Sequence, residues 1–173
     1  WATLEWWLKG KPSVLGAASG MVAGLATITP ASGFVKPMPA LIIGFIAGVF
    51  CYLMVTAVKS KFGYDDSLDA FGVHGAGGTM GALLTGVFAT NAVNNALKDA
   101  NGNPLPLGLV DGNAAQIGNQ AIGVLIAIVL GAVGSFICLK IADIVCGLRP
   151  TADEESDGLD LAMHGEEGYN LEA

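Results

Sequence analysis

The feature that most constrains this chain is a series of apolar runs, most of them as long as a membrane span. A helix needs about 20 apolar residues to cross the hydrocarbon core of a bilayer. Four runs reach roughly that length, and a shorter one opens the chain like the end of an earlier span. The runs cover residues 1–8, 13–29, 39–58, 68–90 and 117–145. The sequence therefore predicts an all-α membrane protein, a polytopic helical bundle with about four full transmembrane helices plus a remnant of a preceding one.

Composition and charge support this interpretation. Hydrophobic residues make up 53% of the chain and charged residues only 13%, whereas about 25% of the residues in a typical soluble domain are charged. Eight of the 15 acidic residues follow Pro150, so we divide the chain into a transmembrane region, 1–149, and an acidic tail, 150–173. We find no basic patch that would bind nucleic acid. Because the chain opens at Trp1 within an apolar run, we expect it to be a fragment of a longer protein.

The basic residues predict the orientation of the spans. Cytoplasmic connections of membrane proteins carry an excess of Lys and Arg, and alternate connections lie on the same side. One side holds Lys9, Lys11, Lys59, Lys61, Lys140 and Arg149, and the other holds Lys36 and Lys98. This asymmetry places the tail in the cytoplasm and the polar loop 91–116 outside, in a multi-pass protein of the cell membrane.

Glycines recur at intervals of four residues on three of the predicted spans. Small residues at this spacing let helix backbones approach closely in lipid, where the burial of apolar side chains provides little driving force. We expect these glycines to form helix-packing surfaces, a role that by itself indicates no function. They are Gly16, Gly20 and Gly24, then Gly44 and Gly48, and finally Gly77 and Gly81.

His74 is the candidate functional residue. It lies roughly 9 Å along the axis of the helix predicted for residues 68–90, and an imidazole at that depth is costly unless it faces a cavity or a partner. The residues on its helical face are Ala70, Phe71, Gly77, Gly78 and Gly81. This nearly bare strip predicts a narrow pore beside His74, with Ala70 and Phe71 also lining it. A histidine that is hydrogen-bonded between packed helices is the alternative.

Other kinds of chemistry find little support in this helix. No second histidine, cysteine or carboxylate lies on it at metal-ligand spacing, and no nucleophile is paired with a base. We therefore expect no metal site, no cofactor and no enzymatic activity. The tail histidine, His164, is expected to be a surface residue.

Three aspartates, Asp65, Asp66 and Asp69, precede the helix that carries His74. Carboxylates are favoured at a helix N-terminus, where they interact with the helix dipole and accept hydrogen bonds from exposed amides. Asp69 fits this structural role least well, because it lies nearest the predicted bilayer. It also fits a role at the inner mouth of a pore.

Residues 65–89, DDSLDAFGVHGAGGTMGALLTGVFA, resemble the ammonium transporter family (Amt/Mep, related to Rh proteins). GKPSVLGAASGMVAGLATITPASGFV resembles the family's eighth helix and its outer end, and ALIIGFIAGVFCYL resembles the ninth. IADIVCGLRPTADEESDGLDLAMHGEEGYN resembles the end of the eleventh helix with the cytoplasmic tail. The whole chain is thus similar to the C-terminal half of a bacterial-type member. The resemblance implies a partial ammonium-transporter fold, in a homotrimer of eleven-helix protomers.

The resemblance also implies roles for individual residues. Family members conduct ammonium or ammonia through an apolar pore in which two histidines face each other. His74 matches the second histidine, and the first lies outside this chain. Thr29 falls at the outer vestibule, and Asp65, Asp66 and Asp69 fall at the inner one. The tail is implied to pack on the cytoplasmic face and to help a PII-type signal protein close the pore, whereas its acidic composition alone is typical of disorder.

Several functions remain open from the sequence. The first is transport across the lipid bilayer. Because dehydration of an ammonium cation in an apolar pore is expensive and a neutral imidazole offers both an acceptor and a donor, we favour deprotonation and relay by a histidine pair. The second is an ammonium sensor or docking module that signals through its cytoplasmic tail. A third is a packing half that functions only when it is joined to its missing partner.

Overall fold

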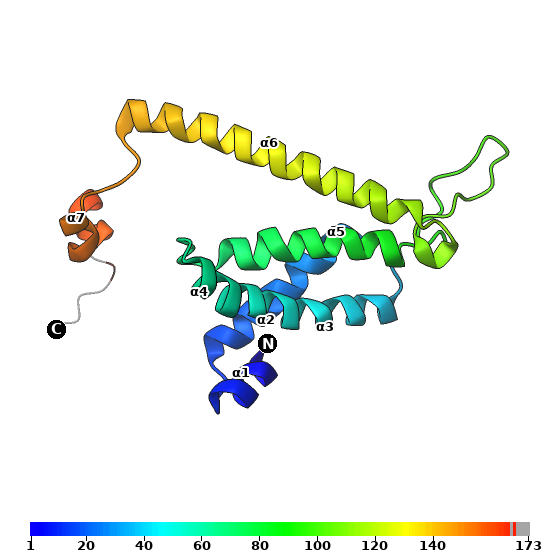
Figure 1. Ribbon diagram of the computed structural model, residues 1–173, viewed down its shortest axis with the longest axis horizontal. Coiled ribbons are helices and arrows are strands. Elements are labelled where there is room, and N and C mark those ends of the chain that lie inside the picture. Colours follow the sequence, from blue (N-terminus) through cyan, green and yellow to red (C-terminus); the bar gives the residue numbers. More distant parts are fainter. Residues whose placement is uncertain (167, 169–173) are drawn as a thin grey trace. The chain divides into compact units, whose positions relative to one another are not determined.

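Figure 1 shows the computed structural model of this chain, which describes residues 1–166 and residue 168. The described residues form helices joined by short helical turns and loops, which confirms the predicted all-α class. The α-helices are α1 (Ala2–Lys9), α2 (Val14–Ile28), α3 (Pro37–Leu53), α4 (Lys59–Phe62), α5 (Ala76–Phe88), α6 (Ala115–Cys146) and α7 (Ala152–Asp157). The shorter turns are η1 (Thr29–Ala31), η2 (Met54–Val58), η3 (Phe71–Gly75), η4 (Leu109–Asp111) and η5 (Asp160–His164). The chain divides into two compact units, residues 1–126 and 127–173.

Three helical segments are long and apolar enough to cross a membrane. They are Val14–Ala31, Pro37–Phe62 and Ala115–Cys146, and they correspond to three of the four predicted full spans. The remaining predicted span is helical over residues 71–88, through η3 and α5, and we call this segment the His74 helix. It is not one of the three, because it contains six glycines and a histidine. Such a composition suits a helix that packs closely against other helices.

The core of the first unit is formed by α2, α3 and the His74 helix. In Figure 1, α3 and α5 run alongside each other and α2 crosses them. The closest approaches occur at two glycines of α5. A Cβ added to Gly77 would lie 2.8 Å from Thr27 Oγ1 and 3.0 Å from Cys51 Sγ, and one added to Gly81 would collide with the Thr27 carbonyl. Because Thr27 and Cys51 are fully buried, these glycines allow the three helices to meet.

The other predicted glycine stripes are divided between packed and open positions. Gly16 lies against the Glu5 carboxylate, and Gly20 lies against the side chain of Trp1. By contrast, a Cβ added to Gly24 or Gly44 would meet no atom of this chain within 4 Å. The predicted packing role is therefore confirmed for part of each stripe rather than for its whole length.

Glu5 links α1 to the start of α2, a contact that the sequence analysis did not predict. Its side chain is only 10% exposed, although it lies in an apolar run. One carboxylate oxygen accepts hydrogen bonds from Ser13 N and Ser13 Oγ, each at 3.0 Å, and Lys9 Nζ lies 3.7 Å from the other oxygen. Ser13 Oγ in turn accepts from Gly16 N at 2.8 Å. The carboxylate thus supports the N-cap of α2.

The tail is helical in two short stretches, where its composition alone predicted disorder. Thr151 and Glu154 form a reciprocal capping box at the start of α7, with Thr151 N donating to Glu154 Oε2 at 2.7 Å. This backbone hydrogen bond, helped by one from the Thr151 hydroxyl, holds the pKa of Glu154 below its ordinary value. His164, at the end of η5, is exposed as expected. Part of the predicted tail, residues 167 and 169–173, lies outside the described residues.

The glycine contact yields a matched pair of variants. We expect Gly81→Ala to destabilise the protein by roughly 1–3 kcal/mol, because the new methyl group must displace the Thr27 backbone. Gly78→Ala, on the same helix, should be neutral or slightly stabilising, since a Cβ there meets open space and alanine is the better helix former. Thermal unfolding of the detergent-solubilised protein measures both effects. Equal stability of the two variants would contradict the proposed contact.

Candidate functional site

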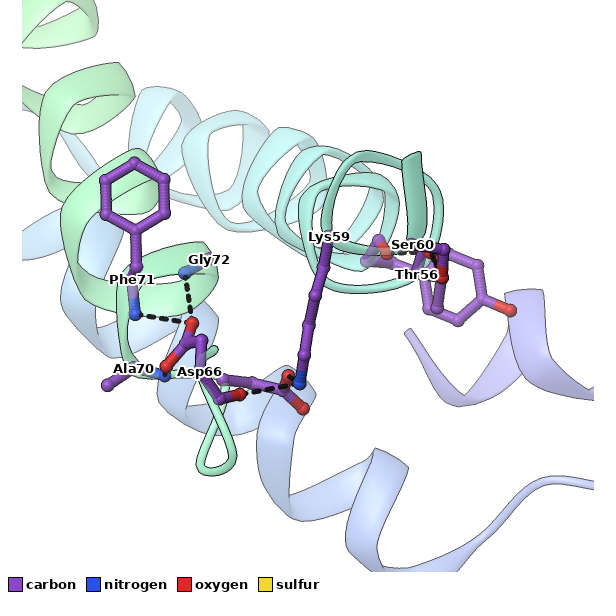
Figure 2. Close-up of polar contacts among 9 residues, drawn as sticks. Thr56, Lys59, Ser60, Asp66, Ala70, Phe71 and Gly72 are labelled. Atoms are coloured by element: carbon purple, nitrogen blue, oxygen red, sulfur yellow. Dashed lines mark hydrogen bonds and ion pairs between the residues drawn. The ribbon is translucent and has the colours of Figure 1, made fainter. Parts of the chain in front are cut away.

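The start of the His74 helix is organised by Asp66. Its carboxylate accepts hydrogen bonds from three successive backbone amides, those of Ala70, Phe71 and Gly72, at 2.8, 3.0 and 3.4 Å. Figure 2 shows this carboxylate facing the first turn of the helix. The first four amides of a helix have no hydrogen-bond acceptor within the helix itself. The Asp66 side chain therefore provides the acceptor for most of these amides. The predicted capping role is therefore confirmed for Asp66.

Asp69 and Asp66 also interact with Lys59, the first residue of α4. Lys59 Nζ donates to the Asp66 carbonyl oxygen at 2.6 Å and forms an ion pair with Asp69 Oδ1 at 2.7 Å. Asp69 has a φ of 56°, in the left-handed region that residues with a Cβ seldom adopt. Asp65 is exposed on the same loop. Asp66 and Asp69, both predicted at the inner mouth, thus make defined structural contacts.

His74 lies within η3, a single π-helical turn that opens into α5. Its imidazole is exposed and is not enclosed by the helices of this chain. The turn adjoins a second π-helical turn, η2, at Gly72, where an added Cβ would lie 2.7 Å from Val55 Cγ2. π-Helical turns are rare and are frequently found at functional sites.

The glycine strip predicted beside His74 needs a correction. Gly77 and Gly81 do not border open space, because they face Thr27 on α2. Of the three predicted glycines only Gly78 meets no atom within 4 Å. The prediction assumed a regular helix of 3.6 residues per turn. The wider π turn at His74 shifts the residues that follow it around the axis.

A groove of about 380 Å³ runs beside His74. One wall comes from α2 and the other from the loop and turn that precede α5. Its lining residues are Leu15, Ala18, Ser19, Val22, Leu68, Asp69, Ala70, Val73 and His74. The groove is mainly apolar, with one hydroxyl, one carboxylate and one imidazole. Such a surface can guide a small molecule past an imidazole while offering few competing hydrogen-bonding groups.

Of the three predicted pore residues, His74 and Ala70 line this groove and Phe71 does not. The ring of Phe71 instead packs edge-on against Tyr64, with centroids 5.7 Å apart, and covers Gly75. Four residues of α2 that line the groove were not predicted, because no local pattern indicates which face of α2 meets the His74 helix.

Comparison with known proteins identifies the family. The sequence profile of the Ammonium Transporter Family matches residues 1–169. This chain belongs to the ammonium transporter family. It is 47% identical to the ammonium transporter of Bacillus subtilis (strain 168) over 169 residues, which cover 98% of this chain and 40% of that protein. It is also 47% identical to the ammonium transporter of Aquifex aeolicus (strain VF5) over 171 residues, 99% of this chain and 38% of that protein.

Solved structures of the family have the same fold. The crystal structure of Saccharomyces cerevisiae Mep2 superposes with a TM-score of 0.77 at 34% sequence identity, covering 88% of this chain and 34% of Mep2. The chain spans about two fifths of the length of the curated relatives named above. Family membership and three membrane-length helices identify it as a membrane protein, and the relatives are transporters rather than enzymes.

Thr29 lies at the opposite end of α2 from Ser13, where this family member was predicted to have its outer vestibule. It begins η1, it is exposed, and its hydroxyl donates to the Leu25 carbonyl at 2.7 Å. That hydrogen bond uses the donor of the hydroxyl and leaves its oxygen able to accept another. The backbone near this end is joined to the start of the loop after α5 by Thr90 N, which donates to the Phe34 carbonyl at 2.9 Å.

Asp111 organises the loop that follows α5. Its carboxylate accepts hydrogen bonds from Thr90 Oγ1 at 2.7 Å, Asn91 N at 2.7 Å and Leu107 N at 3.1 Å. Partial burial by itself would raise the pKa of Asp111, but these hydrogen bonds and the charge of Lys36 outweigh it and hold the pKa below its ordinary 3.8. The polar composition of this region predicts only a solvated loop. The one local sign of the ordered turn is the carboxylate of Asp111 beside Gly112, a turn-forming residue.

The pKa of Asp111 predicts how the loop responds to pH. A depressed pKa means that the carboxylate stabilises the folded loop above its unfolded pKa, and that this contribution is lost as the pH falls through the folded value. Hydrogen-exchange protection of the Asn91 and Leu107 amides should therefore be constant at neutral pH and decrease only as the pH falls below about 4. In Asp111→Asn, protection should be lower from the start and should vary less with pH after correction for intrinsic exchange. Identical pH profiles in the two proteins would exclude this role.

Proposed function

We propose that this chain forms part of an ammonium transport pathway across the membrane, in which ammonia or ammonium passes His74. The observation that carries the proposal is the exposed imidazole of His74 in a mainly apolar groove, in a chain that belongs to the ammonium transporter family. The low polarity of the groove disfavours a bare cation. A neutral imidazole, by contrast, both accepts and donates hydrogen bonds.

His74 would act as the second member of a histidine pair, whose first member lies outside this chain. In this mechanism, ammonium gives up its proton near the imidazole, ammonia crosses the apolar segment, and the histidines relay the proton separately. Thr29 would offer a hydroxyl oxygen at the outer vestibule. Asp65, Asp66 and Asp69 would give the inner vestibule a negative charge that favours a departing cation. Ala70 lines the groove next to His74, and Phe71, which packs against Tyr64, would hold the adjacent turn.

The proposed setting is the cell membrane, with residues 1–149 as the membrane region and residues 150–173 as a cytoplasmic tail. The distribution of Lys and Arg supports this orientation, because Lys9, Lys11, Lys59 and Lys61 belong to connections on one side and Lys36 to the other. The family resemblance supports a homotrimer and a PII-type signal protein as the partner of the tail. These assignments concern the whole protein, of which the chain is one segment.

The histidine variant tests the transport role. In the complete gene product reconstituted into proteoliposomes, His74→Ala should lower the rate of ammonium uptake about 100-fold. A loss of this size is typical when a proton-transfer group is removed. His164→Ala is the matched control, because it removes the same side chain from the exposed end of η5. Its uptake should equal that of the unmodified protein. Normal uptake by folded His74→Ala protein would rule out a role of this imidazole in transport.

The proposed orientation is tested with single cysteines in a complete gene product whose native cysteines, including Cys51, Cys138 and Cys146, are replaced by alanine. Asn101→Cys lies in the loop after α5, and Ser156→Cys lies in α7. In intact cells, a membrane-impermeant maleimide should label the first variant, and it should label the second only after permeabilisation. Labelling of Ser156→Cys in intact cells would place the tail outside and overturn the domain assignment.

A further inference from the structure

Lys59 lies near the end of the helical segment Pro37–Phe62 and connects it to the loop before the His74 helix. Its ammonium nitrogen contacts two different groups of that loop, the Asp66 carbonyl oxygen at 2.6 Å and Asp69 Oδ1 at 2.7 Å (Figure 2). The two side chains are partly shielded, with 30% of Lys59 and 34% of Asp69 exposed. A charge-assisted hydrogen bond in such a setting is stronger and better oriented than a fully exposed surface ion pair.

The contact with Lys59 stabilises an unfavourable turn. Asp69 N donates to the same Asp66 carbonyl at 3.1 Å, so the turn 66–69 is closed at an oxygen that Lys59 also binds. Asp69 occupies the left-handed region with a φ of 56°, a conformation that costs free energy for a residue with a Cβ. The carbonyl of Asp69 then accepts from Val73 N at 3.0 Å. The turn is thus connected to Lys59 by a side chain and to η3 by the backbone.

The same turn determines where the His74 helix starts. The Asp66 carboxylate accepts hydrogen bonds from the amides of Ala70, Phe71 and Gly72, and His74 follows two residues after Gly72. Gly72 also packs against Val55, in the π turn that directly precedes Lys59 along the chain. Lys59 is therefore connected to the His74 turn in two ways. One is through its polar contacts with Asp66 and Asp69, and the other is through the packing of Val55 against Gly72.

We propose that Lys59 is a positioning residue for transport: through Asp66 and Asp69, its ammonium group holds the π-helical start of the His74 helix in the rotation that directs His74 into the groove. This inference rests on the proposed function of His74. Without the ammonium group, the left-handed turn at Asp69 loses its partner and relaxes. The amides held by Asp66 then shift, and His74 moves relative to the α2 wall of the groove.

The principal test compares three variants of the complete gene product in proteoliposomes. Lys59→Met keeps most of the apolar stem and removes the charge, and Lys59→Arg keeps the charge. Lys61→Met is the matched control, because Lys61 is exposed on the same helix and its ammonium lies over the Phe62 ring. The maximal uptake rate should fall about 10- to 100-fold in Lys59→Met, as expected for a displaced functional group. It should recover in part in Lys59→Arg and stay unchanged in Lys61→Met.

A second readout follows His74 directly and does not depend on transport. The imidazole ¹⁵N signals of His74, assigned by their loss in His74→Ala, should shift in Lys59→Met and stay in place in Lys61→Met at the same pH. Asp69→Gly provides an independent variant, because glycine adopts the left-handed conformation without strain and removes the carboxylate partner. It should reproduce the signal shift of Lys59→Met. If Lys59→Met does not fold, the His74 signals of Asp69→Gly test whether the Lys59–Asp69 contact positions His74.

The outcomes separate this inference from the proposed function. Unchanged His74 signals and unchanged maximal uptake in both Lys59→Met and Asp69→Gly would overturn the positioning role. If His74→Ala transports normally while Lys59→Met still shifts the His74 signals, the transport role of His74 fails although Lys59 does orient the ring. Shifted signals together with reduced uptake, reversed in part by Lys59→Arg, support the inference.

Discussion

The arrangement of this chain depends on the close contact between α5 and α2 at Gly77 and Gly81. In a lipid environment, apolar side chains gain little by leaving the solvent, so helices associate through close packing of small residues. The two glycines bring the α5 backbone against Thr27 and let Cys51 of α3 reach the same point. That contact fixes which side of the His74 helix is covered. The groove beside His74 lies against a different part of α2, at Leu15, Ala18, Ser19 and Val22.

Polar groups are concentrated at the two ends of this core, where carboxylates bind backbone amides. Asp66 holds the first turn of the His74 helix, and Asp111 holds the loop that follows its other end. Both carboxylates satisfy donors that would otherwise be costly to bury. Between these ends, the groove contains the imidazole of His74 among mainly apolar residues. Among the described residues that line the same groove, Asp69 is the one acidic group.

The contacts around the start of the His74 helix also explain why two unusual features lie next to each other. A left-handed aspartate and a π-helical turn are each unfavourable by themselves, and such conformations persist where surrounding contacts determine them. Here the surrounding contacts are the Lys59 ion pair, the Asp66 cap and the packing of Gly72 on Val55. Together they place His74 at a defined angle on a helix that is otherwise rich in glycine. The residues that stabilise this turn therefore adjoin the histidine on which the proposed function rests.

The sequence by itself determined the all-α class, the membrane-length helices, the family and a helix-capping role for the aspartates that precede the His74 helix. These properties follow from residues that are close together along the chain, because hydrophobicity, helix length and N-capping act over a few turns. Only the tertiary structure decided that Gly77 and Gly81 pack on Thr27 instead of bordering a pore, that Phe71 turns toward Tyr64, and that Leu15, Ala18, Ser19 and Val22 face His74. Each of these facts depends on contacts between helices that are distant in sequence. A single π turn is enough to change which residues meet, because it rotates every side chain that follows it around the helix axis.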